Sequence, residues 1–286
     1  MSIDLRGRVI AISGAGTGIG RAAAIAVAQR GMHVALAGRR ADKVAEVAQQ
    51  VRGVGVKALA MACDVAQPAQ CEAFIDAAER ELGPVYAVFA NAGYGVEKPT
   101  YAMSDGDIRE MFETNFFGSL NFIRPALDRM LARDQAQSPP RGHVLWCSSC
   151  LSKLGMPFYA CYSATKACQD HFARGMRLEL ASRGVFVSSV HPVGTRTDFF
   201  DTAASLSGGR LRAMGNESPR SARFTQPPET VARAIVRCLE RPRGEVWTSV
   251  SARLGFALAD LWPELTDRAL AIALRKRFQA AESQAK

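Results

Sequence analysis

Short apolar segments alternate with longer amphipathic segments along most of the chain. The apolar segments are rich in β-branched residues, which is typical of strands buried on both faces of a parallel sheet. They predict strands near residues 8–13, 33–38, 56–61, 85–90, 143–148, 185–190 and 245–249. Between them, apolar residues at helical spacing predict helices near 18–30, 41–52, 68–82, 105–132, 160–182 and 228–240. We therefore expect an α/β fold, a doubly wound parallel sheet of about seven strands with helices on both faces.

A glycine-rich turn, Gly14-Ala-Gly-Thr-Gly-Ile-Gly20, joins the first predicted strand to the first predicted helix. Glycines let backbone N–H groups approach a pyrophosphate, and the helix N-terminus favours its negative charge. The strand–turn–helix context indicates a dinucleotide site of Rossmann type. The spacing of Gly14, Gly18 and Gly20 differs from the common G-x-G-x-x-G, and a tight turn without a ligand is the alternative interpretation.

A candidate acid/base pair lies in Tyr162-Ser-Ala-Thr-Lys166. Residues four apart on a helix share a face, with Cβ atoms roughly 5–6 Å apart. An ammonium group near a phenol favours the phenolate, and a tyrosine tuned in this way can exchange a proton with a carbonyl or alcohol oxygen. Taken alone, the same spacing also fits an ordinary pair on a helix surface.

Further motifs follow in a fixed order along the chain: Cys63-Asp-Val65, Asn91-Ala-Gly93, Asn115, Ser149 and a segment from Pro192 to Thr197. Together with the glycine turn and the tyrosine–lysine pair, they resemble the short-chain dehydrogenase/reductase family over about residues 5–250. The resemblance implies a dinucleotide-binding catalytic domain over residues 1–250, with a substrate loop at 198–227. Residues 251–286 would form a C-terminal helical extension of the same domain.

The resemblance also implies roles for four catalytic residues. Ser149 would hold the substrate oxygen, and Tyr162 would give that oxygen a proton in reduction or take its proton in oxidation. Lys166 would lower the pKa of Tyr162 and bind the nicotinamide ribose. Asn115 would hold a water that links Lys166 to solvent, although a buried amide bonded to backbone is the commoner state of a lone asparagine.

The same resemblance implies a cofactor site made of three groups of residues. Pro192 and Thr197 would meet the nicotinamide carboxamide, although Val193 stands where the family commonly has glycine. Asp64 and Val65 would border the adenine. The remaining cofactor residues would be Gly14, Gly16, Thr17, Gly18, Ile19, Gly20, Asn91, Ala92, Gly93 and Thr195, with Tyr162 and Lys166.

The second predicted strand ends in Ala37-Gly-Arg-Arg40, with no acidic residue before Asp42. An acidic residue at this position binds the ribose 2′-hydroxyl of NAD, whereas an arginine fork suits the extra phosphate of NADP. We therefore expect NADP(H), with Arg39 as the main contact and Arg40 beside it. Two solvated arginines at the start of a helix are the alternative.

Composition and charge narrow the function further. The net charge of +9, from 36 basic and 27 acidic residues, suits an anionic cofactor. The basic residues are scattered and no nucleic-acid reader motif is visible, so we expect no nucleic-acid partner. Seven cysteines lack framework spacing, and no secretory leader or bilayer-spanning run is visible, which favours a cytoplasmic protein. Cys147-Ser-Ser-Cys150 has no matching ligand pair, so we expect no metal.

The expected substrate is a small-molecule carbonyl or alcohol. Beside Ser149 and Tyr162, the pocket would be formed by residues 94–100, residues 151–159 and the 198–227 loop. The apolar side chains of these segments favour a bulky apolar compound; they are Tyr94, Leu154, Met156, Phe158, Phe199 and Phe200. An NADP(H)-sensing binding protein that performs no turnover is the main alternative.

Residues 251–282 form two amphipathic stretches separated at Pro263. They would pack on the chain's own core or on a neighbouring subunit, or they would contact a membrane surface, which would make the protein a peripheral enzyme. By analogy with the family we also expect a homodimer or homotetramer.

Overall fold

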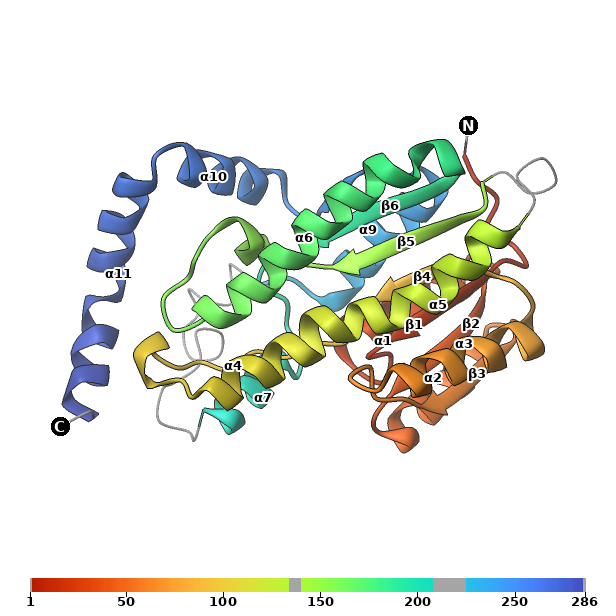
Figure 1. Cartoon of the computed structure of the whole chain (residues 1–286), viewed down its shortest axis with the longest axis horizontal. Coiled ribbons are helices and arrows are strands. Elements are labelled where there is room, and N and C mark those ends of the chain that lie inside the picture. The colour runs from red at the N-terminus through yellow and green to blue at the C-terminus, as the bar shows by residue number, and fades with distance from the viewer. Residues whose placement is uncertain (1, 134–139, 208–224, 285–286) are drawn as a thin grey trace.

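The computed structural model describes residues 2–133, 140–207 and 225–284, and a seven-stranded parallel sheet forms the centre of this part of the chain (Figure 1). The strand order is β3-β2-β1-β4-β5-β6-β7, which confirms the doubly wound α/β fold. The strands are β1 (Val9–Ser13), β2 (His33–Gly38), β3 (Ala58–Ala62), β4 (Val85–Ala90), β5 (Gly142–Cys147), β6 (Val185–His191) and β7 (Glu245–Trp247).

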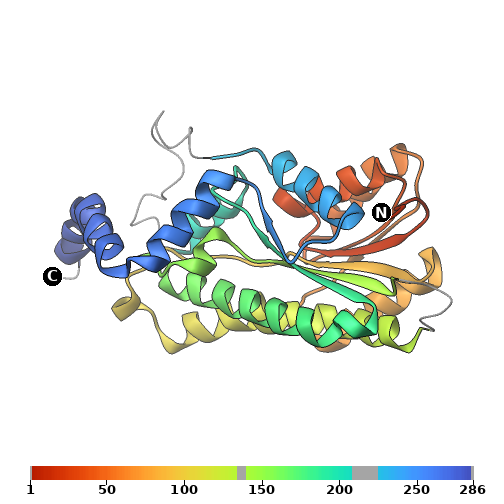
Figure 2. The same cartoon turned by 90° about the horizontal axis from the view of Figure 1, so that it is seen from above.

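Helices cover both faces of the sheet (Figure 2). The helices α1 (Gly18–Ala28), α2 (Ala41–Gly53) and α9 (Pro228–Glu240) lie on one face, and α3 (Pro68–Leu82), α5 (Gly118–Ala132) and α6 (Ala160–Leu180) lie on the other. Side chains of β1 alternate between the two faces of the sheet. Ile10 and Ile12 join the apolar layer under α1, α2 and α9, while Val9 and Ala11 join the layer under α3, α5 and α6. Successive strand residues point to opposite faces, so every position of this central strand is buried.

One expected helix changes its winding where the site is built. The helix expected over 105–132 is present, and it consists of α4 (Asp105–Phe112), a π-helical segment (Glu113–Phe117) and α5 in direct succession. A π segment adds a residue to the turn and is frequent at functional sites. Asn115 lies within it, and the side chain of Asn115 bonds to the backbone of Tyr94. A contact with a distant loop therefore accompanies a π-helical turn that the local pattern does not predict.

The topology gathers the sequence motifs at one edge of the sheet. β1 pairs with both β2 and β4, so the winding direction reverses between β1 and β4. In such sheets, ligands bind at the carboxyl ends of the strands beside this reversal. The glycine turn follows β1, Asn91 follows β4 and Ser149 follows β5, so all of them lie at that edge.

Two helices follow β7 at the C-terminal end: α10 (Val250–Leu261) and α11 (Pro263–Gln284). Pro263 opens α11, where the sequence predicts a break between two stretches. α10 lies beside the short 3-10 turn η3 (Cys150–Lys153), and α11 stands at one end of the molecule (Figures 1 and 2). Of the expected substrate loop 198–227, the structure describes α7 (Phe199–Leu206), Ser207 and residues 225–227; residues 208–224 lie outside the described part.

Candidate active site

A cavity of about 940 Å³ runs along the carboxyl edge of the sheet and has the size of a small-molecule or cofactor site. It brings together residues that lie far apart in the sequence. The expected site residues that line it are Gly14, Gly16, Thr17, Gly18, Ile19, Arg39, Arg40, Asp64, Val65, Asn91, Ala92, Gly93, Tyr94, Ser149, Tyr162, Lys166, Pro192, Thr195, Thr197 and Phe199.

The glycine turn fits close approach of a ligand to the backbone. Gly14 and Gly18 have φ of 61° and 53°, a conformation that favours glycine. A Cβ on Gly14 would lie 2.9 Å from the Cα of Ala92. Contrary to the expectation, Gly20 does not line the cavity. It packs against the carbonyl of Gly14. α1 begins at Gly18 without a side-chain cap, which leaves its N-terminal N–H groups available to an anion.

Asn91 joins the glycine turn to the end of β4. Its Nδ2 donates to the carbonyls of Ser13 (3.0 Å) and Gly14 (3.2 Å). In return, the Ser13 hydroxyl accepts from the backbone N–H groups of Asn91 and Ala92 at 3.0 and 3.1 Å. These reciprocal bonds fix the two strand ends on either side of the topological reversal. Val193, the departure from the family pattern, is accommodated without a positive φ.

Basic side chains gather where the cavity meets the end of β2. Arg39 and Arg40 are exposed and line this end. Lys43, in the first turn of α2, lines it as well and bonds to Glu46. The sequence reading missed Lys43, although its position one helical turn after Arg39 is the signal that could have found it.

Tyr162 lies in the cavity wall beside Phe199, with ring centroids 5.1 Å apart. The sequence predicts a lowered pKa for Tyr162, but the structure indicates a shift in the opposite direction. Burial raises the pKa of this phenol, and the nearby Cys147 thiol acts in the same direction, while a hydrogen bond with Ser149 opposes them. The low-polarity surroundings penalise the phenolate, so Tyr162 is protonated at neutral pH.

Lys166 lies near Tyr162, but its ammonium bonds elsewhere. Nζ is 5.6 Å from the centroid of the Tyr162 ring, and it donates to the Cys147 carbonyl at 2.8 Å and to Gln169 Oε1 at 3.0 Å. Burial lowers the pKa of Lys166, which is only 3% exposed. The ammonium is therefore held by the carbonyl of the cavity-lining Cys147 and by the buried Gln169.

Gln169 connects Lys166 to the π-helical segment. Its Nε2 donates to the Asn115 carbonyl (2.5 Å) and to the Ser119 hydroxyl (2.8 Å), and Gln169 is fully buried. The sequence-based prediction did not include Gln169. The available signal was its spacing, because positions three and four apart share one helix face and Gln169 is three residues beyond Lys166.

Asn115 is buried and does not line the cavity. Its side chain accepts from the Tyr94 N–H at 2.9 Å and donates to the Tyr94 carbonyl at 2.8 Å, which fixes the loop after β4. Its Nδ2 also lies 3.1 Å from the Thr165 hydroxyl. The side chain therefore organises the cavity wall, and the backbone carbonyl of Asn115 is the group that faces Gln169.

Two expected substrate residues are not part of the cavity wall. Phe158 is buried with φ of 67° and packs in an apolar cluster that includes Phe278 of α11. Leu154 leaves η3 in an extended conformation. Leu151, Met156 and Tyr159, which belong to the same expected segment 151–159, line the cavity, and the side chain of Phe200 lies outside the described part of the structure.

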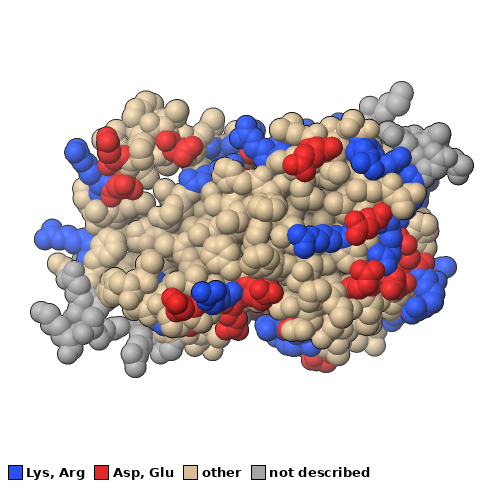
Figure 3. Space-filling view, in the orientation of Figure 1, with Lys and Arg blue, Asp and Glu red and all other residues tan. Residues whose placement is uncertain are grey.

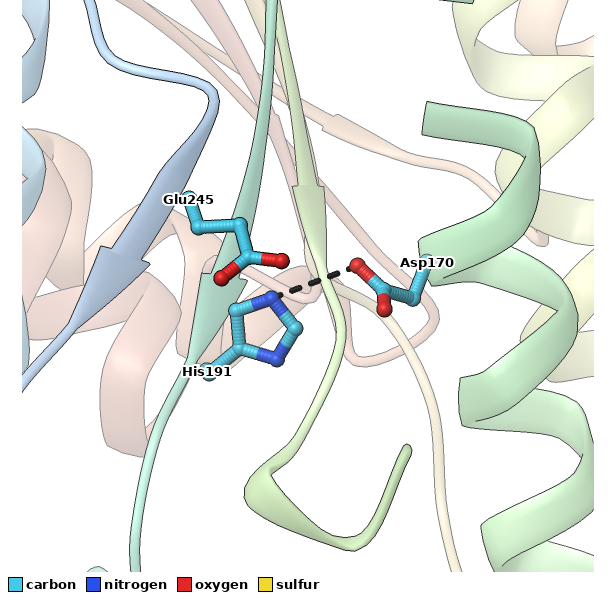
Figure 4. Close-up of side chains that lie close together, drawn as sticks. All are labelled: Asp170, His191 and Glu245. Atoms are coloured by element: carbon cyan, nitrogen blue, oxygen red, sulfur yellow. Dashed lines mark ion pairs between the residues drawn. The ribbon is translucent and has the colours of Figure 1, made fainter. Parts of the chain in front are cut away.

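Among the described residues, Asp170, His191 and Glu245 form a set of potential metal ligands (Figure 4). Lys153 occupies the space between the two carboxylates: its Nζ donates to Asp170 at 2.6 Å and to Glu245 at 3.2 Å. A bound ammonium supplies the charge that a cation would bring. The set is therefore an ion network, and the His191 Nδ1, 3.1 Å from the Ser149 carbonyl, connects it to the active-site turn.

The charges of this network shift the pKa of Asp170. Burial acts to raise that pKa, but hydrogen bonds from His191 and Lys153 and their charges outweigh it and hold the pKa of Asp170 well below its usual range. The Trp247 ring stacks on the His191 ring, with centroids 4.7 Å apart and planes 8° apart. The end of β6 is thus held firmly beneath Ser149.

Comparisons with known proteins agree with this geometry. Residues 8–206 match a family model described as short chain dehydrogenase. The glycine betaine reductase ATRR of Emericella nidulans is 33% identical over 240 residues, which span 83% of this chain but 18% of that protein.

Two solved structures at 25% identity resemble the chain. A short chain dehydrogenase/reductase from Burkholderia phymatum in complex with NAD has a TM-score of 0.79, and the match covers 92% of this chain and 96% of that one. An alcohol dehydrogenase from the archaeon Thermococcus sibiricus, complexed with 5-hydroxy-NADP, has a TM-score of 0.71, with 84% and 95% covered.

Proposed function

The chain belongs to the short-chain dehydrogenase family of oxidoreductases, and from that premise we propose that it uses NADP(H) to interconvert a carbonyl and a secondary alcohol. One observation carries the proposal. A single cavity is lined by the glycine turn, by a pair of arginines and by Ser149, Tyr162 and Lys166. This lining supports a site in which an anion-binding segment and a proton donor share one wall.

The cofactor would be held by the chain's own polar groups. The N–H groups at the start of α1 would receive the pyrophosphate, and Arg39, Arg40 and Lys43 would receive the 2′-phosphate of NADP. Solved relatives are described in complex with NAD or with an NADP derivative, so the preference for NADP rests on these three cations. When bound, the cofactor supplies or accepts the hydride at the substrate carbon.

Tyr162 would supply the proton in the reductive direction. Its raised pKa keeps the phenol protonated at neutral pH, so the hydroxyl can give its proton to the substrate oxygen as the carbonyl becomes an alcohol. Ser149 would hold that oxygen by a hydrogen bond. Lys166 would stabilise the phenolate that Tyr162 becomes, because an ammonium nearby favours that form.

The apolar part of the wall favours a bulky substrate. Tyr94, Leu151, Met156, Tyr159 and Phe199 line the cavity together with Tyr162, and apolar walls with a few polar groups are typical of small-molecule sites. We propose a ketone that carries an aromatic or multi-ring apolar body. Fold alone does not identify a substrate, so the lining residues are the basis of this proposal.

The test has a binding step and a turnover step. Fluorescence titration with NADPH and then NADH measures cofactor preference, and the loss of NADPH absorbance with a panel of apolar ketones measures reduction. We expect tighter binding of NADPH and turnover of at least one bulky ketone. NADPH binding without turnover of any ketone or alcohol would favour the sensing protein instead.

Self-association remains part of the proposal. Figure 3 shows a broad area with few charged side chains over α5 and α6. Phe117 and Phe172 are each 47% exposed near this area, and exposed apolar side chains of this size mark interaction surfaces. We propose a homodimer or homotetramer that buries them. Light scattering during size-exclusion chromatography tests this, and a monomer at every concentration would contradict it.

A peripheral membrane contact has support from α10 and α11. Leu254, Leu258, Leu261, Trp262 and Leu265 are all more than half exposed, as in helices that lie at a lipid interface. No helix in the described part of the chain has the length and apolarity needed to cross a membrane. Sedimentation with liposomes, comparing the protein with its Leu258→Glu variant, would detect a surface contact.

A further inference from the structure

α11 is joined to the rest of the molecule through a few side chains. Leu274 is 8% exposed, and Arg277 and Phe278 are half-buried, whereas Ile272 and Arg275 are exposed. Among the described side chains, the contacts of α11 therefore lie just past the middle of the helix. These residues face the loop after β4 and the turn before α6, the two segments that contribute Tyr94 and Tyr159 to the cavity wall.

Glu97 is the centre of this contact. It is 1% exposed, and its carboxylate accepts from the Tyr159 hydroxyl at 2.8 Å and pairs with the guanidinium of Arg277. Its backbone N–H donates to the Ser207 hydroxyl at 2.9 Å, just after α7. A buried carboxylate is costly unless it is paired, so the cation from α11 compensates a charge that is bonded to the cavity-lining Tyr159.

Ring packing makes a second contact beside the ion pair. The Phe278 and Phe158 rings stack with centroids 5.4 Å apart and planes 28° apart, and the Arg277 guanidinium lies 5.3 Å from the centroid of Phe158. Phe158 has a positive φ, which is unfavourable for a bulky side chain. The packing from α11 offsets that strain and holds the turn that leads into Tyr159.

The same apolar cluster reaches the candidate catalytic residue. Phe158 and Tyr159 are its buried members, and Leu151, Met156, Tyr162 and Phe278 pack against them. Leu151, Met156 and Tyr159 also line the cavity. A shift of α11 would therefore be transmitted directly to the wall that the substrate would touch.

We propose that Arg277 and Phe278 are positioning residues, through which the C-terminal helix fixes the apolar wall of the substrate cavity and sets the size of carbonyl compound that fits. The proposal rests on the proposed function for its substrate class. Its structural half, that α11 orders residues 94–100 and 156–159, is independent of any activity.

The test compares Arg277→Gln and Phe278→Ala with Arg275→Gln, an exposed neighbour on the same helix. With a series of ketones of increasing size, we expect KM for the bulkiest to rise about tenfold in the first two variants, with kcat changed less and Kd for NADPH within about twofold. Arg277→Lys should recover part of the loss, because it restores the charge beside Glu97. Unchanged KM across the series in both variants would overturn the proposal.

A second readout separates this proposal from the proposed function. Hydrogen exchange reports local opening, and it needs no substrate. We expect faster exchange over residues 94–100 and 156–159 in Arg277→Gln but not in Arg275→Gln. If no ketone is turned over and this difference is present, the proposed reaction fails while the ordering role of α11 stands. Equal exchange in the two variants would overturn the ordering role itself.

Discussion

The Lys166 ammonium donates to the side-chain oxygen of Gln169 at 3.0 Å, and Gln169 in turn donates to the Asn115 carbonyl at 2.5 Å. A buried glutamine thus links the candidate catalytic helix α6 to the π-helical segment. The Gln169 oxygen accepts a hydrogen bond from the Lys166 ammonium, and the glutamine side chain itself is uncharged. The acceptors stabilise the ammonium form of Lys166, while burial lowers its pKa.

Gln169→Met should weaken catalysis by releasing Lys166. Hydrogen bonds to charged groups contribute about 1.5–3 kcal/mol, so we expect kcat to fall about tenfold or more. Without the acceptor, the pKa of Lys166 falls further, and the alkaline limb of the pH–rate profile should move to lower pH. Gln169→Glu keeps an acceptor for Lys166 and should leave that limb at or above its original position. An alkaline limb at the same pH in the wild type, Gln169→Met and Gln169→Glu would contradict the role given to Gln169.

Arg39→Ala should weaken NADPH far more than NADH. A charge-assisted bond to phosphate is lost only with NADPH, and at about 1.5–3 kcal/mol this corresponds to a rise in Kd of about tenfold to a hundredfold. The dissociation constant for NADH should change by less than about twofold. Fluorescence titration measures both constants, and the exposed Arg80→Ala serves as the control for net charge. Equal weakening of both cofactors would show that Arg39 does not contact the 2′-phosphate.

Asp170→Asn should destabilise the fold in a pH-dependent way. Removing one partner of a buried ion network costs about 3 kcal/mol or more, whereas the exposed pair broken by Asp76→Asn should cost about 1 kcal/mol or less. Because the folded state holds the pKa of Asp170 below its usual range, its stabilisation is complete above the unfolded pKa of about 4 and is lost as pH falls below it.

Urea unfolding at several pH values checks this expectation. The difference in free energy of unfolding between the wild type and Asp170→Asn should be constant at neutral pH and should shrink under acid conditions. A difference that grows on acidification would contradict the sign of the shift. The Asp76→Asn variant, measured beside it, separates the effect of the network from the general loss of a negative charge.

Local patterns were sufficient for the framework of the protein. The central strands β1, β4 and β5 are buried at every position, so they appear as largely apolar runs. The glycine turn and the Tyr162–Lys166 spacing are visible within a few residues of sequence. Strand bounds agree within about two residues, as expected for pattern-based assignment. Pro263 separates the last two helices because its ring cannot continue the preceding one.

The remaining features depend on contacts between distant segments. Asn115 lies in a π-helical turn and bonds to the backbone of Tyr94, and Arg277 reaches Glu97 across 180 positions of sequence. The direction of the Tyr162 pKa shift depends on how far the phenol is buried, which spacing alone does not reveal. The backbone of Phe158 takes a left-handed conformation that propensity disfavours, which moved its side chain out of the expected pocket.

The central claim is that Tyr162 donates the proton in an NADPH-dependent carbonyl reduction, and it is tested most directly by comparing the wild type with Tyr162→Phe. NADPH consumption with a bulky ketone and the Kd for NADPH are measured for both proteins. We predict turnover by the wild type, a loss of at least about a thousandfold in Tyr162→Phe and nearly equal NADPH affinity, because only the hydroxyl is removed. Comparable turnover by the two proteins would contradict the mechanism.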